Sequence, residues 1–278
     1  MGRTYTQIRD LIEQILQDTG NATWTTDELD LLIPMALTEV SSVCPRLVRS
    51  ILTTTASSRR LVLPANTLRN LLWIDKAEYP VAQDPPYYRN VQRFGNMIEI
   101  EIDDAPSSAA SLYLHLAKKH VLLTTLGTTD TAGAVKTAGS EGDTTLALKS
   151  LGTGTIEQDA ILTIAGDTFE YTVTAQATIA ANEATVSIEP GLSADVAANA
   201  VITLSDSSLD VDMENVLAGI SAGIASINKA TSDIGGISVG SANTPAQREQ
   251  WGMLKLQDAR ARLKTMAYKR VAYDYPKD

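Results

Sequence analysis

Residues 24–45, WTTDELDLLIPMALTEVSSVCP, contain the signals that begin and end one amphipathic helix. Thr25 and Glu28 have the spacing of a capping box, in which each side chain accepts a hydrogen bond from the other residue's backbone N–H. Apolar side chains then recur at helical spacing, and Pro45 marks the end because the residue before a proline disfavours helical conformation. Pro34 lies inside the pattern, so we expect a kink or a restart of the helix there.

Regular patterns continue on both sides of this helix. Residues 4–18 place apolar side chains on one helical face, and Gly20 is suited to end that helix. Residues 47–122 instead show short runs bounded by turn residues, as strands do. The clearest are 97–102, where three isoleucines alternate with two glutamates, and 111–117, where three leucines share one face. We expect a small antiparallel sheet or sandwich in this region.

The charge of the chain is concentrated in one internal segment. The 278 residues carry a net charge of −10, and residues 127–210 alone contain twelve acidic and two basic residues, whereas the remainder contains 21 of each. Such an asymmetry indicates two units of different origin. We therefore expect an inserted acidic β domain at 127–206, with linkers at 123–134 and 205–212. Its predicted strands are 135–138, 144–148, 161–164, 169–174, 184–188 and 201–204.

Two helices are expected after the acidic segment. Residues 213–230 are rich in alanine, glycine and serine, which allow a second helix to approach closely. Pro245 is suited to the first turn of the last helix, which carries many basic side chains. Three interpretations of these cations stay open: a solvated face, a docking surface for an acidic partner and, third, contact with nucleic acid, which the acidic balance of the chain disfavours.

Together these elements predict an α+β fold. A helical domain with a small antiparallel β sheet is expected from residues 1–126 and 207–278, interrupted by an all-β inserted domain at 127–206. No apolar run of about twenty residues is present, so we expect no membrane span, and the polar start predicts no secretory signal. The single cysteine, Cys44, is interpreted as a small buried hydrophobe.

Residues with catalytic or metal-binding chemistry are few and scattered. His115 and His120 lie five apart in a chain with one cysteine, so a zinc site is not expected. The Gly-rich stretch 151–155 lacks the Lys-Ser/Thr pair of a phosphate-binding loop, and no serine or cysteine lies in a nucleophile elbow. Glu99 and Glu101 are interpreted as a solvated sheet face. We accordingly expect no enzyme, no catalytic residue, no metal and no cofactor.

Four segments carry a resemblance to a known family. They are the N-terminal helix, the WTTDEL start of the next helix at 24–29, the strand pattern LLWI…AEYPV at 71–81, and a C-terminal pair in which an Ala/Gly-rich helix and a Gly-Gly loop precede WGML at 251–254. In this order they resemble the head–tail connector (adaptor) proteins of tailed bacteriophages, over roughly residues 4–123 and 212–275. The inserted segment separately resembles small Thr/Ala/Gly-rich β modules of virion proteins.

The resemblance implies a structural role in the virion. Family members assemble under the portal protein as a ring, usually of twelve subunits, extend the DNA channel and offer a docking surface for the stopper or tail. We therefore expect a homo-oligomeric ring at the virion neck, assembled in the host cytoplasm, through which packaged DNA passes without specific binding. A basic C-terminal helix that reaches toward the portal is also family-like, and the expected portal-docking residues are Arg260, Arg262, Lys264, Lys269 and Arg270.

Other functions stay open at this point. Another virion part, such as a tail terminator or baseplate component, would share the β content but should not bind portal. A module at 135–204 that recognises a host glycan is less favoured, because the segment has only two aromatic residues, and a hydrolase is least favoured. The acidic domain has three interpretations: decoration of the outer ring, contact with the tail or a neighbouring subunit, or lining of the channel, where negative charge lets DNA slide.

Overall fold

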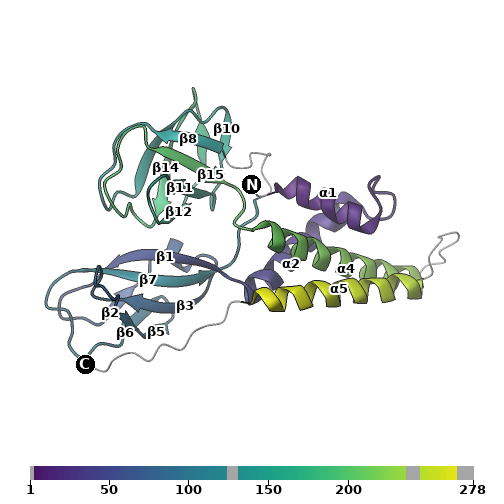
Figure 1. The fold of residues 1–278 in the computed structure, drawn as a ribbon, viewed down its shortest axis with the longest axis horizontal. Coiled ribbons are helices and arrows are strands. Elements are labelled where there is room, and N and C mark those ends of the chain that lie inside the picture. The colour runs from purple at the N-terminus through teal and green to yellow at the C-terminus, as the bar shows by residue number, and fades with distance from the viewer. Residues whose placement is uncertain (1–2, 124–130, 236–244, 268–278) are drawn as a thin grey trace. The chain divides into compact units, whose positions relative to one another are not determined.

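The computed structural model describes residues 3–123, 131–235 and 245–267. Within these ranges the chain forms α-helices and antiparallel β-sheets, one of which closes into a barrel (Figure 1). The mixed α+β class expected from the sequence is therefore confirmed. By the contacts between its residues, the chain divides into a helical unit and a β unit.

The helical unit begins with α1 (Tyr5–Leu16), which has a capping box of its own. The Oγ1 of Thr4 accepts from the backbone N–H of Gln7 at 3.1 Å, and the Gln7 side chain accepts from the Thr4 N–H at 3.0 Å. Helix α1 ends before the expected stop at Gly20. Gln17 already adopts the left-handed conformation, and its N–H donates to carbonyl oxygens of the last helical turn.

The second helix, α2 (Thr26–Val43), starts at the predicted capping box, whose reciprocal bonds are both present. The helix is continuous across Pro34, so a restart there is wrong. A proline has no N–H, and the carbonyl four residues earlier, that of Asp30, consequently loses its helical partner. The hydroxyl of Tyr5 on α1 donates to this carbonyl at 3.1 Å and takes the place of the missing bond.

The last two helices, α4 (Val211–Gly235) and α5 (Pro245–Met266), pack with their backbones unusually close. A Cβ placed on Gly252 would lie 2.8 Å from the carbonyl oxygen of Gly223, and one placed on Gly223 would lie 3.0 Å from that of Gly252. Neither position has room for a side chain. The close helix contact expected from the small residues of 213–230 is therefore confirmed.

These four helices share one hydrophobic core. Each contributes a stripe of aliphatic side chains, and each fully buried leucine or isoleucine contributes roughly 1.5–3 kcal/mol to the stability of the unit. The buried side chains include Ile8 and Ile12 of α1, Leu29, Ile33 and Val40 of α2, Leu217 and Ile220 of α4, and Leu263 of α5.

The β unit contains two antiparallel sheets within residues 46–121. Buried side chains of both sheets, among them Ile98, Ile100 and three leucines of β7, form one cluster, so the expected antiparallel pairing and burial pattern are confirmed. The four-stranded sheet has the order β1 (Arg46–Thr53), β7 (Ser111–Lys118), β3 (Leu71–Glu78), β4 (Tyr88–Arg89). The three-stranded sheet has the order β2 (Arg60–Val62), β6 (Met97–Ile100), β5 (Val91–Phe94), and the short α3 (Ala65–Leu68) follows β2.

A closed six-stranded barrel lies within residues 131–205. Its closure leaves none of these six strands with an unpaired edge. Leu146, Leu148, Leu162, Tyr171 and Val186 are among its fully buried side chains. The strand order is β11 (Ile161–Ile164), β12 (Glu170–Val173), β14 (Glu183–Glu189), β9 (Thr145–Lys149), β8 (Thr131–Val135), β15 (Val201–Ser205), and β10 (Gly154–Ile156) pairs separately with β13 (Ala177–Ile179).

The start of the barrel differs from the sequence expectation. Because β8 occupies 131–135, the predicted linker at 123–134 is wrong at its end and the strand expected at 135–138 lies too late. Three of the five residues of β8 are the small residues Ala132, Gly133 and Ala134, which are not typical of strands. A Cβ on Gly133 would lie 2.6 Å from Cδ2 of Leu151 and 3.0 Å from the backbone oxygen of Lys149, so a larger residue there would force a shift of Leu151. The sequence analysis did not predict β10 and β13 as strands.

The contacts between residues also group the two sheets at 46–121, while the predicted domain bounds stay a prediction. The sheets at 46–121 are expected with the helices, whereas by contacts they group with the barrel. Two ion pairs contribute to this grouping: Arg46 Nη2 lies 3.1 Å from Glu170 Oε2, and Arg69 Nη2 lies 2.7 Å from Asp159 Oδ2. Hydrophobic periodicity is a local signal and carries no information about such pairs.

Candidate interaction surfaces

Arg260, the first of the predicted docking residues, binds another helix of its own chain. It forms a two-bond ion pair with Glu39 of α2, with Nε–Oε1 at 2.5 Å and Nη2–Oε2 at 3.0 Å. The hydrogen bonds to Glu39 hold the pKa of Arg260 above its usual value. A charge reversal at this position would therefore weaken the α2–α5 contact as well as any docking.

Arg262 and Lys264, like Arg260, have exposed side chains on α5. Arg262 pairs with Asp258 one turn earlier at 3.2 Å, and an exposed pair of this kind has little energetic weight. Lys264 lies in the last turn of α5, where the helix dipole favours a cation. Lys269 and Arg270 lie outside the described residues.

The solvent side of α2 carries two large apolar side chains that the sequence interpretation missed. Leu31 is 71% exposed, and Met35, one turn later, is 58% exposed. The core stripe of α2, which includes Leu29 and Ile33, lies on the other side of the helix. The signal was available in the sequence, because Leu31 and Met35 are four residues apart and out of phase with that stripe. A helix with a second apolar face is typical of a contact with a partner.

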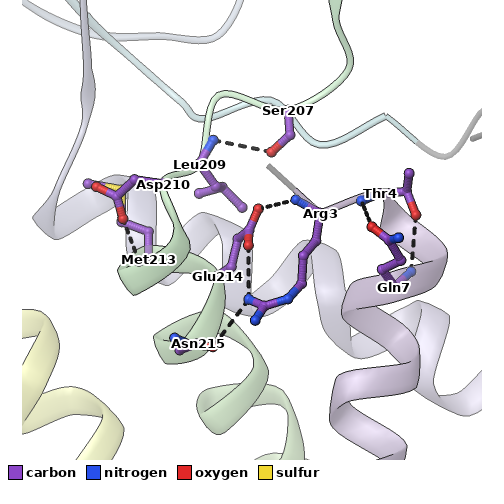
Figure 2. Close-up of polar contacts among 9 residues, drawn as sticks. All are labelled: Arg3, Thr4, Gln7, Ser207, Leu209, Asp210, Met213, Glu214 and Asn215. Atoms are coloured by element: carbon purple, nitrogen blue, oxygen red, sulfur yellow. Dashed lines mark hydrogen bonds and ion pairs between the residues drawn. The ribbon is translucent and has the colours of Figure 1, made fainter. Parts of the chain in front are cut away.

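Figure 2 shows the hydrogen bonds between Arg3, which precedes α1, and the first turn of α4. Glu214 is fully buried, and its two oxygens accept from the backbone N–H of Arg3 at 2.5 Å and from Nη1 of Arg3 at 3.0 Å. Nη1 of Arg3 also donates to Oδ1 of Asn215 at 3.2 Å. Asp210 caps α4 by accepting from the N–H of Met213 at 2.7 Å, so the helix begins slightly before its predicted start. Because a buried carboxylate is costly without a partner, the Arg3 pair fixes the segment before α1 against α4.

A cleft of about 580 Å³ lies between the α1–α2 loop and the facing parts of α4 and α5. Trp24 and Trp251 line it, and Nε1 of Trp24 donates to the carbonyl of Ala225 at 3.2 Å. In its wall, Asp18 accepts from the backbone N–H groups of 22–24 at 2.8–3.0 Å. Burial acts to raise the pKa of Asp18, but these donors outweigh it and hold the pKa below its usual value. The carboxylate thus shapes the loop.

The surroundings of His115 are those of a packed, neutral side chain. Its Nε2 lies 3.8 Å from Oε2 of Glu78, and its ring is edge-on to Tyr88. Burial, together with the charges of Lys76 and Arg49, lowers the pKa of His115 to about 4. Among the described residues, no three His, Cys, Asp or Glu side chains are grouped so that they could hold a metal ion.

Comparisons of the chain with protein-family models, with curated proteins and with solved structures found no match. None of the described helices combines the length and the apolar composition needed to cross a membrane. The function is therefore inferred from the residues and surfaces of the chain itself.

Proposed function

We propose that this chain is a non-enzymatic subunit of the ring that joins head and tail in a tailed bacteriophage. The ring, of twelve subunits as the family resemblance implies, binds the portal protein and provides a docking surface for the stopper or tail. It extends the DNA channel, and packaged DNA passes through without specific binding. It needs no cofactor, is assembled in the host cytoplasm and resides at the virion neck.

The observation that carries this proposal is the exposed pair formed by Leu31 and Met35 on α2. The opposite face of α2 is already buried in the core of the helical unit, so this second apolar face is free to meet another molecule. Full burial of each side chain contributes roughly 1.5–3 kcal/mol. A closed ring removes such a surface from water in every copy, because each subunit makes the same contacts as the next.

The exposed end of α5 is the proposed portal-docking surface. The double variant Arg262→Glu/Lys264→Glu should lose portal binding while its melting temperature stays close to that of the wild type, since both side chains are exposed. Arg260→Glu is the matched comparison, because it also breaks the ion pair with Glu39 and should lower the melting temperature. Pull-down of the double variant at the wild-type level would exclude this end of α5 from docking.

In this proposal the barrel is an insertion in the ring subunit and decorates the outer surface of the ring. Its first and last strands pair with each other, Thr131 lying opposite Leu204, so the two ends of the insertion are close together. Residues 130–206 can therefore be deleted and the ends joined by a short linker. Rings of the deletion variant that still assemble and accept tails support decoration, whereas rings that reject tails assign the barrel to the tail contact.

Size-exclusion chromatography with light scattering, with and without purified portal, tests the proposal as a whole. The expected result is a monomer alone and a ring of uniform mass on portal. A stable tube formed by the chain alone would instead favour a tail protein such as a tail terminator. Failure to associate with portal at low and moderate salt would contradict the proposal.

A further inference from the structure

A row of exposed apolar side chains crosses the three-stranded sheet of the β unit. Val62 on β2 and Phe94 on β5 are both paired with Met97 on the central strand β6. Directly paired residues project from the same face of a sheet, and the opposite face carries Leu61 and Ile98 into the core. Val62 is 63% exposed, Phe94 is 58% exposed, and Met97 is half-buried between them. We call these three residues the sheet row.

The members of the sheet row are neighbours across paired strands, and Leu31 and Met35 are neighbours along one helix. Residues four apart on a helix lie side by side, whereas the consecutive Met253 and Leu254 of α5 point about 100° apart. The other large apolar side chains that are exposed are not joined in this way along one helix or across paired strands. They are Leu47, Tyr87, Val201 and Val211.

Each subunit of a ring needs two different contact surfaces. In a closed ring of more than two subunits the contacts are heterologous, so one surface of a subunit meets another surface of the next. The Leu31–Met35 pair is a ridge on a helix, and the sheet row is a strip on a pleated face. A helix ridge against a sheet face is a common packing of two such elements.

An acidic residue lies beside the Leu31–Met35 pair, and a basic residue lies beside the sheet row together with its partner Glu99. Asp27, exposed in the acidic first turn of α2, lies one turn before Leu31. Arg60 lies two residues before Val62, on the same face of the sheet, and its ion pair with Glu99 is at the surface, where such pairs rearrange at little cost. Contact between unlike surfaces brings Asp27 toward Arg60.

We propose that the Leu31–Met35 pair of one copy packs on the sheet row of the next copy around the ring. This inference rests on the proposed function, which requires the ring, and it names the two surfaces that meet there. The occupant of both surfaces is therefore a second copy of this chain.

Pairs of introduced cysteines test the contact. The native Cys44 is 2% exposed, so its thiol is shielded from the oxidant. After mild oxidation of portal-bound rings, Met35→Cys/Phe94→Cys should give a ladder of disulfide-linked oligomers on a non-reducing gel. Each single variant should run as a monomer, and an equal mixture of the two should stop at dimers, because each copy then has one reactive thiol. The matched control Leu254→Cys/Phe94→Cys should give no ladder.

Light scattering of the same samples separates this inference from the proposed function. A ring of wild-type mass in which Met35→Cys/Phe94→Cys gives no more ladder than the control overturns the contact and leaves the ring. Dimers from Met35→Cys alone indicate a two-fold contact between α2 helices, which also overturns it. If the wild type forms no ring with or without portal, the proposed function and the contact both fail.

A substitution gives a second, independent measurement. Met35→Glu should abolish the ring while the thermal unfolding curve stays that of the wild type, because Met35 lies outside the core of the helical unit. Intact rings of Met35→Glu would overturn the contact.

Discussion

Removal of the Tyr5 hydroxyl should reveal how α2 tolerates its internal proline. Pro34 leaves the carbonyl of Asp30 without a helical N–H, and the Tyr5 hydroxyl donates to it at 3.1 Å. In Tyr5→Phe the ring keeps its packing, but a partly buried carbonyl loses a donor. The expected loss is about 1–2 kcal/mol of unfolding free energy.

A second substitution isolates this bond from every other role of Tyr5. Pro34→Ala restores an N–H that bonds the Asp30 carbonyl within the helix. It should also stabilise α2, since proline costs about 3 kcal/mol relative to alanine in an ordinary helix interior, part of which the Tyr5 bond already offsets. In the Pro34→Ala background, Tyr5→Phe should cost about 0.5 kcal/mol or less, which gives a coupling energy of roughly 1 kcal/mol.

Urea unfolding of the four proteins, followed by far-UV circular dichroism, measures this coupling. The same cost of Tyr5→Phe in both backgrounds would refute the role of the Tyr5–Asp30 hydrogen bond.

The contribution of this hydrogen bond also depends on pH. Burial, with the nearby Asp30 charge, raises the pKa of Tyr5 to about 12. Because the folded pKa lies above the unfolded one, this contribution is complete below pH 10 and is lost as the pH rises towards 12.

Three further perturbations have defined outcomes. Gly252→Ala should lower the unfolding free energy by about 1–3 kcal/mol in urea titrations, since the added methyl meets the carbonyl oxygen of Gly223; a neutral result would mean that α4 and α5 separate easily. Glu214→Ala leaves Arg3 without its buried partner and should speed amide hydrogen exchange in the first turn of α1, and unchanged exchange would contradict the anchor. Between pH 6.5 and 4 the unfolded chain protonates His115 before the folded chain does, so stability falls as the pH drops; His115→Gln should flatten this slope, and an unaltered slope would assign it to other groups.

The features that the sequence predicted correctly depend on residues close together in the chain. The capping box at Thr25 and Glu28 needs a spacing of three, and the burial of Ile98 and Ile100 needs only the two-residue period of a strand. Both signals are complete within a few residues. Tertiary packing did not override them.

The features that the sequence did not predict join residues far apart. Nothing near Arg260 in the sequence indicates that its partner is Glu39, and this pair links two helices through a residue for which docking stays a prediction. The restart at Pro34 is wrong for the same reason, because the donor that replaces the lost bond comes from another helix. Leu31 was not predicted as an exposed apolar residue because the helical period of α2 marks its buried stripe, and Leu31 is out of phase with that stripe.

The pairing of β8 with β15 has a consequence for the history of the gene. Thr131 lies opposite Leu204, Ala134 lies opposite Val201, and outside the barrel Leu122 and Ser207 form an isolated bridge. The chain therefore enters and leaves the barrel through neighbouring strands, which are separated by about 5 Å. A recombination event that inserts or removes the coding segment for the barrel would therefore alter the rest of the fold at one site only. Residues 123–206 contain eleven acidic and two basic residues, a net charge of −9 out of the total of −10, so a single such event also switches the chain between an acidic and a nearly neutral form.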